Sequence, residues 1–146
     1  MSQLFTYAKA GIWAGLAAGI VTAIPLASGI ILMGNVVLKT SSTQFTELLI
    51  AAPLSAIAIL PVLGLVSGLL IYYVTLRRQV IGSRTRAIAA GALLLLFTAP
   101  ISFVNAFGYS TDYAYLVGAL VVLRTLTFIF VFGWYLGRKH NPPEAN

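Results

Sequence analysis

Cysteine is absent from this sequence, and histidine and acidic residues are scarce. The 146 residues include one histidine, three acidic residues and no cysteine. Disulfides, thiolate catalysis and cysteine-based metal sites are therefore excluded. The histidine, His140, lies in a polar tail, so there is no histidine pair for haem or a metal and no nucleophile–base pair. We expect a protein that is not an enzyme and that holds no cofactor or metal.

Charged residues are also rare. They make up 8% of the chain, whereas 60% of the residues are apolar and the mean hydropathy is +0.97. A soluble domain carries roughly 25% charged residues, and a domain this small exposes too much surface to hide so many apolar side chains from water. The sequence therefore predicts an integral membrane protein.

Four long apolar runs account for most of the chain. Each is long enough to cross about 30 Å of hydrocarbon as a helix that rises about 1.5 Å per residue. The first run exceeds the ~7–15-residue apolar core of a signal peptide, so we interpret it as a retained helix. The runs are continuous and do not alternate, which favours helices over barrel strands. We expect one all-α domain, an antiparallel four-helix transmembrane bundle at about residues 10–34, 48–76, 87–108 and 113–136.

Basic residues gather on one side of this expected bundle. Four spans place both termini and the segment 77–86 on the same side. Seven cations then lie there, namely Lys9, Arg77, Arg78, Arg84, Arg86, Arg138 and Lys139. The opposite side carries Lys39 with Glu47 and Asp112. The positive-inside rule predicts cytoplasmic N and C termini for a multi-pass protein of the plasma (inner) membrane.

The formal net charge of +6 raises the question of the partner. Cations at the ends of apolar runs orient a membrane protein and do not form a nucleic-acid-binding face, so we expect no nucleic acid. Anionic lipid headgroups are the expected partners of the central basic segment. The residues that would contact them are Arg77, Arg78, Arg84 and Arg86.

Small residues recur at every fourth position of the first span. They are Gly11, Gly15, Gly19, Ala23 and Ala27. Such a line of small side chains lets two helix backbones approach closely. The same spacing recurs at two glycine pairs, Gly64 with Gly68 and Gly133 with Gly137. We interpret these positions as helix-packing faces, and the sequence leaves open whether the partner of the first is another helix of this chain or a second protein.

Arg124 differs from the other cations because it lies near the middle of an expected span, 113–136. An arginine at mid-bilayer costs about 2.5–3.5 kcal/mol on insertion scales, and it usually faces protein or a water-filled cavity. It therefore marks a candidate intramembrane polar site.

The preceding span supplies polar groups at a similar depth. Pro100 has no N–H to donate to the Leu96 carbonyl, which leaves that oxygen without its helical partner. We hypothesise that the Leu96 carbonyl and the Thr98 hydroxyl satisfy the Arg124 guanidinium. Ser102 and Asn105 complete the candidate site.

Three classes of function stay open, the third being a lipid-interacting protein in which the basic segment 77–86 captures anionic headgroups. The first is a structural or accessory subunit that packs through its small-residue faces with itself or with a larger membrane complex. The alternative is a small oligomeric channel or transporter for a neutral or anionic solute, with Arg124 lining the path. Prolines inside the spans are typical of broken transporter helices, but they also occur in membrane helices without a transport role. A water-accessible cavity that reaches Arg124 would favour the second class.

Overall fold

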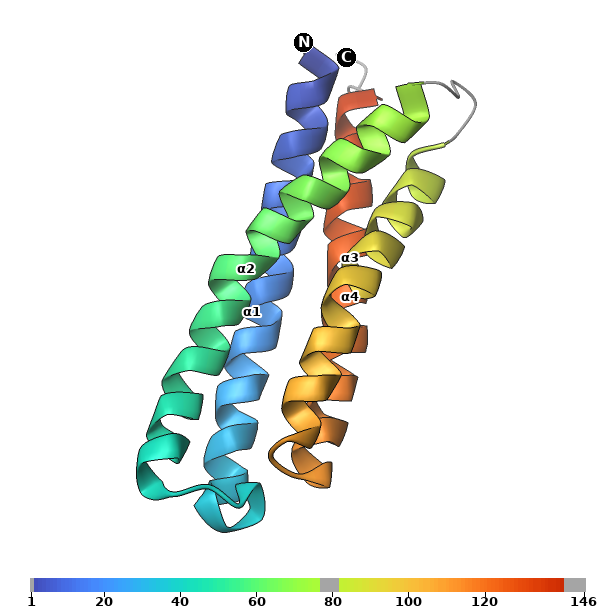
Figure 1. Cartoon of the computed structure of the whole chain (residues 1–146). Coiled ribbons are helices and arrows are strands. Elements are labelled where there is room, and N and C mark those ends of the chain that lie inside the picture. The colour runs from blue at the N-terminus through green and yellow to red at the C-terminus, as the bar shows by residue number, and fades with distance from the viewer. Residues whose placement is uncertain (1, 77–81, 141–146) are drawn as a thin grey trace.

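The computed structural model describes residues 2–76 and 82–140, which form four helices and, in these two ranges, no strand. The helices are α1 (Ser2–Leu38), α2 (Ser42–Leu76), α3 (Ser83–Phe107) and α4 (Thr111–His140). They stand side by side with alternating direction (Figure 1). All four are long and apolar enough to cross a membrane. The all-helical, four-helix prediction is therefore confirmed.

The bundle has two unlike ends. At one end α1 begins, α2 ends, α3 begins and α4 ends; we call it the basic end (Figure 1). The α1–α2 and α3–α4 connections lie at the opposite end, which we call the hairpin end. Which end faces the cytoplasm stays a prediction from the charge distribution.

The α1–α2 connection is shorter than the apolar runs indicate, because α2 begins at Ser42 and not near residue 48. The Ser41 hydroxyl accepts a hydrogen bond from the Gln44 N–H at 3.3 Å. In return, the Gln44 side-chain oxygen accepts one from the Ser41 N–H at 3.1 Å. This reciprocal pair is a capping box, which satisfies two amide groups at the start of a helix. The connection is thus reduced to residues 39–41, and the polar residues from Ser42 to Gln44 belong to the first turn of α2.

Close backbone contact joins α1 to α2. A Cβ added at Gly11 would overlap the Gly64 carbonyl, and one added at Gly15 would overlap the Leu60 carbonyl. At Gly19 it would lie 2.9 Å from the Ala56 carbonyl oxygen. The glycine line of α1 therefore packs on α2 of the same chain.

The other glycine pairs differ from each other. A Cβ at Gly68 would lie 2.6 Å from the Tyr7 carbonyl oxygen, so this residue continues the α1–α2 contact. On α4, a Cβ at Gly133 would lie 3.2 Å from the Ala87 Cβ of α3. Gly137 has nothing within 4 Å of that position in the described part of the chain. One helix-packing residue of the four on α2 and α4 thus lacks a neighbour.

Tyr7 connects all four helices at the basic end. Its side chain is buried, and its ring lies 5.5 Å from the Tyr72 ring on α2 and 6.3 Å from the Phe132 ring on α4. The Arg86 side chain on α3 donates a hydrogen bond from Nη1 to the Tyr7 hydroxyl. Around this residue lies the larger of two apolar clusters, which includes Phe128, Phe132, Leu60 and Leu94.

A second apolar cluster lies toward the hairpin end and includes Leu26, Leu38, Leu48 and Tyr113. Leu38 reaches it because α1 is broken at Gly34, where φ is 66° and ψ is 174°. Glycine adopts this left-handed φ without the steric cost that a Cβ brings. The break redirects the last turn of α1 so that Leu38 becomes fully buried.

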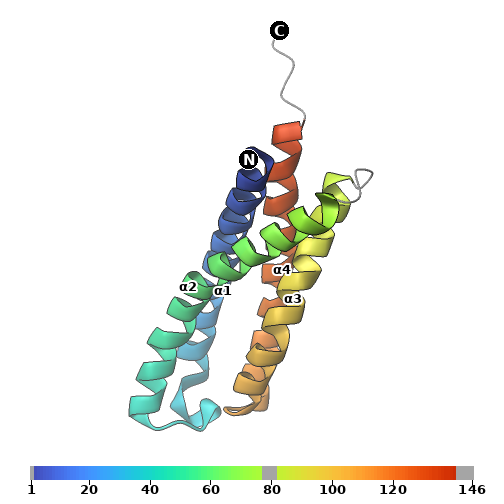
Figure 2. The same ribbon diagram turned by 45° about the horizontal axis from the view of Figure 1, so that its top comes forward.

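The two helix hairpins are not packed together along their whole length. α2 approaches α3 at the basic end and diverges from it toward the hairpin end (Figures 1 and 2). α1 and α4 stay in contact there, since a Cβ at Gly29 of α1 would overlap the Leu116 side chain of α4. The bundle is therefore closed along the α1–α4 side and spread along the α2–α3 side.

Candidate functional site

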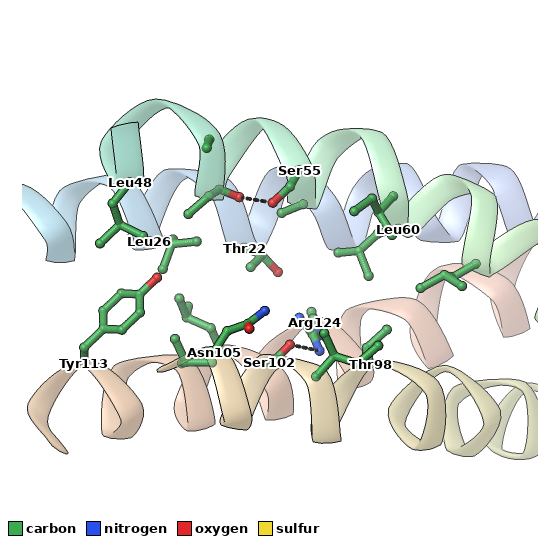
Figure 3. Close-up of a pocket in the computed structure, with 18 of the residues that line it drawn as sticks. Thr22, Leu26, Leu48, Ser55, Leu60, Thr98, Ser102, Asn105, Tyr113 and Arg124 are labelled. Atoms are coloured by element: carbon green, nitrogen blue, oxygen red, sulfur yellow. Dashed lines mark hydrogen bonds between the residues drawn. The ribbon is translucent and has the colours of Figure 1, made fainter. Parts of the chain in front are cut away.

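A cavity of about 590 Å³ lies between the α1–α2 hairpin and the α3–α4 hairpin. All four helices line it, and Figure 3 shows its side chains. Its volume falls within the roughly 300–1,000 Å³ of small-molecule sites. Most of the lining is apolar, and the polar side chains concentrate on α3 and α4.

Buried apolar side chains bound the cavity toward both ends of the bundle. Leu48 and Tyr113 lie toward the hairpin end, where they belong to the second cluster and are 8% and 5% exposed. Leu60 lies toward the basic end, where it belongs to the cluster around Tyr7. Buried residues of both apolar clusters therefore contribute to the lining of the cavity.

The cavity is bordered by exposed residues on its α2–α3 side. On α2 these are Ala51, Ser55 and Ile59, and on α3 they are Phe97, Ile101 and Asn105. Each set has a four-residue spacing, which places its members on one face of a helix. We call these six residues the lateral rim. They lie where α2 and α3 diverge, so the cavity opens sideways between these two helices.

Arg124 of α4 lies on the wall of the cavity and is only 7% exposed. Its Nη2 donates a hydrogen bond to the Ser102 hydroxyl of α3 at 3.2 Å (Figure 3). Its Nε is buried and has no hydrogen-bond partner in the described residues. The two described acidic residues, Glu47 and Asp112, are exposed near the hairpin end, and neither is paired with Arg124.

The hypothesis about the partners of Arg124 was wrong in its details. Thr98 lines the cavity, but its hydroxyl donates to the Leu94 carbonyl of its own helix at 2.8 Å. The hydrogen bond of Arg124 goes to Ser102 and not to the Leu96 carbonyl, and the Leu96 side chain is 67% exposed. The acceptor is Ser102, one turn beyond Thr98. Counting residues predicts how deep a group lies along its helix, but it does not predict the direction in which the group points around the helix axis.

Of the five residues in the predicted polar site, the structure brings four together. Arg124, Thr98, Ser102 and Asn105 all line the cavity. Pro100 is exposed and is not among the lining residues. Pro100 lies two positions along the helix from both Thr98 and Ser102, about 200° around the axis at 3.6 residues per turn, so it points away from the side on which these two lie.

Two further hydroxyls reach the cavity from the opposite hairpin. The Thr22 hydroxyl of α1 donates to the Ala18 carbonyl at 2.7 Å, and the Ser55 hydroxyl of α2 donates to the Ala52 carbonyl at 2.8 Å. Their oxygens keep lone pairs directed away from the helix. Thr22 could not be predicted as a lining residue, because a lone threonine in an apolar run looks the same in the sequence whether or not it faces a cavity.

The predicted lipid-contacting arginines are described only in part, because Arg77 and Arg78 lie outside the described residues. Arg84 is exposed at the basic end. Arg86 is half-buried: it bonds Tyr7, and its Nε is buried without a partner in the described part of the chain. Arg86 therefore connects α3 to α1, whereas Arg84 is the one of this pair that faces outward.

Four long apolar helices fit a small multi-pass membrane protein, and between them lies a partly polar cavity. The chain matches no protein-family model, and no curated protein or solved structure matches it either.

Proposed function

We propose that this protein binds a small anionic molecule in the cavity between its two hairpins, with Arg124 as the contact for the negative charge. One observation carries the proposal: a cation that is 7% exposed lines a cavity and keeps an unbonded Nε. An uncompensated charge is costly to hold inside a membrane protein. A bound anion would reduce this cost by pairing with the guanidinium.

The groups beside Arg124 suit such an anion. The guanidinium presents several N–H donors in a fixed plane, a geometry that fits a carboxylate or phosphate group. The Asn105 amide has two N–H donors of its own, and it makes no hydrogen bond in the described part of the chain. The Ser102 hydroxyl, already bonded to Arg124, holds the guanidinium against α3.

The cavity and Arg124 favour binding of a solute over a role as an accessory subunit. The close glycine contacts of Gly11, Gly15 and Gly19 are made within the chain, so they no longer call for a partner helix. In an accessory role, a partner helix would pack on α4 at Gly137, which has open space around it in the described structure. The buried side chains of Leu60 and Tyr113 border the cavity along the bundle axis, so its lining does not favour a continuous channel.

We also propose a location and an orientation for the protein. We place the protein in the plasma (inner) membrane with the basic end in the cytoplasm, where anionic lipids contact Arg84. The role is binding or transport and not catalysis. Self-association remains part of the proposal as the way in which Gly137 becomes covered.

Ligand-induced stabilisation tests the proposal. The purified protein, in a mild detergent, is heated with each of a panel of carboxylates and phosphates, and the Tm is measured. Binding to the folded state raises the Tm in a concentration-dependent way. We expect at least one anion to stabilise the wild type, and Arg124→Gln to abolish this effect.

Arg84→Gln provides a matched control, since Arg84 is an exposed cation outside the cavity. It should respond to the same anion as the wild type does. Equal responses of the wild type and Arg124→Gln, or no response to any anion, would refute the proposal. Uptake of the stabilising anion into proteoliposomes then separates a transporter from a binding protein.

A further inference from the structure

The shape of the cavity restricts how a ligand reaches Arg124. Buried side chains of the two apolar clusters border the cavity along the bundle axis, Leu60 toward the basic end and Leu48 with Tyr113 toward the hairpin end. The lateral rim is exposed along two turns of α2 and two turns of α3. The α2 residues of the rim, with Phe97 and Ile101 of α3, lie well inside apolar helices that are long enough to span a membrane, whereas Asn105 lies two residues before the end of α3. In a bilayer most of the rim would face the hydrocarbon, which opens a route to the cavity from the lipid phase.

The cavity has a polar region and an apolar region. The Arg124 guanidinium, Ser102 and Asn105 form a polar region on α3 and α4. The facing hairpin is mostly apolar, with Leu26, Ile59 and Leu63, and its two lining hydroxyls, those of Thr22 and Ser55, already donate to carbonyls of their own helices. A molecule that fills the whole cavity must match both regions, and so it must be amphipathic.

The charge of the site limits the charge of the ligand. Arg124 is the one cation among the lining residues, and no acidic residue lines the cavity. A single negative charge is therefore neutralised, whereas a second one would be left without a partner in a medium of low polarity.

On the basis of the proposed function, we infer that the ligand is a single-chain amphiphile with one carboxylate, of the fatty-acid type, which enters from the bilayer between α2 and α3. Its carboxylate lies against Arg124 and Asn105. Its chain lies along the apolar wall and leaves through the lateral rim. The carboxylate could also belong to a small water-soluble acid, and the experiment separates these two sources.

Binding is measured with the full-length protein in nanodiscs of phosphatidylcholine, a lipid without net charge. The probe is radiolabelled palmitate, and the competitors are unlabelled palmitate, acetate and hexadecanol. We expect saturable palmitate binding that unlabelled palmitate displaces. Acetate should not compete at concentrations up to about a hundred times higher, and hexadecanol, which lacks the charge, should compete at least about tenfold less well.

Two substitutions test the site and its opening. Arg124→Gln should weaken palmitate binding by about tenfold or more. Ser55→Trp places a large ring on the rim and should weaken it as well. The matched control is Val122→Trp, an equally large change on the exposed face of α4 away from the cavity, which should bind as the wild type does.

A cross-link provides a second test that leaves the fold intact. Because the chain has no cysteine, Ser55→Cys with Ile101→Cys introduces the only two thiols, one on each side of the rim. A disulfide-containing bifunctional reagent that joins them should slow palmitate binding, and a reductant should restore the rate.

The outcomes distinguish the two proposals. If acetate or another soluble anion binds through Arg124 and palmitate binds no better, the lateral amphiphile is refuted while the anion site stands. If palmitate binds equally to the wild type and Arg124→Gln, or if no anion binds, both are refuted. An unchanged rate after cross-linking refutes lateral access alone.

Discussion

Gly11 of α1 and Gly64 of α2 touch through their backbones, each occupying the space that a Cβ on the other would need. A Cβ at either position would overlap the carbonyl oxygen of the other. In a membrane, where lipid tails are as apolar as the side chains, such close packing is a main source of helix association. The relationship is reciprocal, so a change at either residue separates the same pair of helices.

Gly11→Leu should therefore destabilise the α1–α2 hairpin. The side chain meets backbone atoms, which cannot rotate away, and overpacking typically costs about 1–3 kcal/mol or more. A lower Tm in detergent measures the effect. Gly137→Ala is the control, since Gly137 has open space around it in the described structure. It should leave the Tm unchanged or raise it, as alanine favours a helix over glycine by about 1 kcal/mol. A Tm of Gly11→Leu equal to that of the wild type would contradict the packing.

Arg124→Leu should raise the stability of the ligand-free protein while removing its response to anions. The substitution removes a buried charge whose insertion costs about 2.5–3.5 kcal/mol, and it loses one hydrogen bond worth about 0.5–1.5 kcal/mol. Thermal unfolding without added ligand gives the answer. Ser102→Ala removes the same hydrogen bond but keeps the charge, so it should lower the Tm slightly. If Arg124→Leu is the less stable of the two, Arg124 is a structural clamp.

Tyr7→Phe should loosen the basic end without removing its aromatic packing. The phenyl ring keeps its contacts with Tyr72 and Phe132, but the Arg86 guanidinium loses its acceptor. Hydrogen bonds to charged groups contribute about 1.5–3 kcal/mol, so a clear decrease in Tm is expected. Tyr73→Phe is the matched control, because Tyr73 is 60% exposed. Similar Tm values for the two variants would show that the Arg86 contact contributes little.

Ser41→Ala should weaken the start of α2. The capping box satisfies two backbone amide groups, and loss of a serine cap costs about 0.5–2 kcal/mol. Amide hydrogen exchange in the first turn of α2 should become faster, while exchange in α4 stays as it was. Ser42→Ala, next along the chain, leaves both hydrogen bonds of the box in place. Equal exchange rates in Ser41→Ala and Ser42→Ala would show that the capping box does not stabilise the start of α2.

Single cysteines test the orientation in a chain that has none of its own. Thr43→Cys lies at the hairpin end and Thr85→Cys at the basic end, and both positions are exposed. The positive-inside rule predicts that a membrane-impermeant maleimide labels Thr43→Cys in intact cells and Thr85→Cys only after permeabilisation. The reverse pattern would invert the cytoplasmic assignment.

Much of the fold could be predicted because one property, apolar length, decides it. A run of apolar residues that is long enough to span a bilayer has few alternatives to a helix. The start of α2 escaped prediction because its signal is polar and local. Ser41 and Gln44 form hydrogen bonds whose spacing, and not whose hydropathy, marks the start of a helix.

The candidate site was predictable in depth but not in direction. The position of Arg124 in the sequence places it midway along α4, and counting residues places α3 groups at the same level. Whether Leu96 or Ser102 faces it depends on how each helix is rotated, which tertiary packing decides. The cavity itself had no signal in the sequence, because it arises where α2 and α3 fail to pack.

The divergence of α2 from α3 leaves the cavity with protein on three sides and none on the fourth. In a bilayer, as proposed above, neighbouring acyl chains would complete that wall, and the surrounding lipid would then be a structural component of the site. The occupancy of such a site follows the concentration of amphiphiles dissolved in the membrane, which is far above their concentration in water.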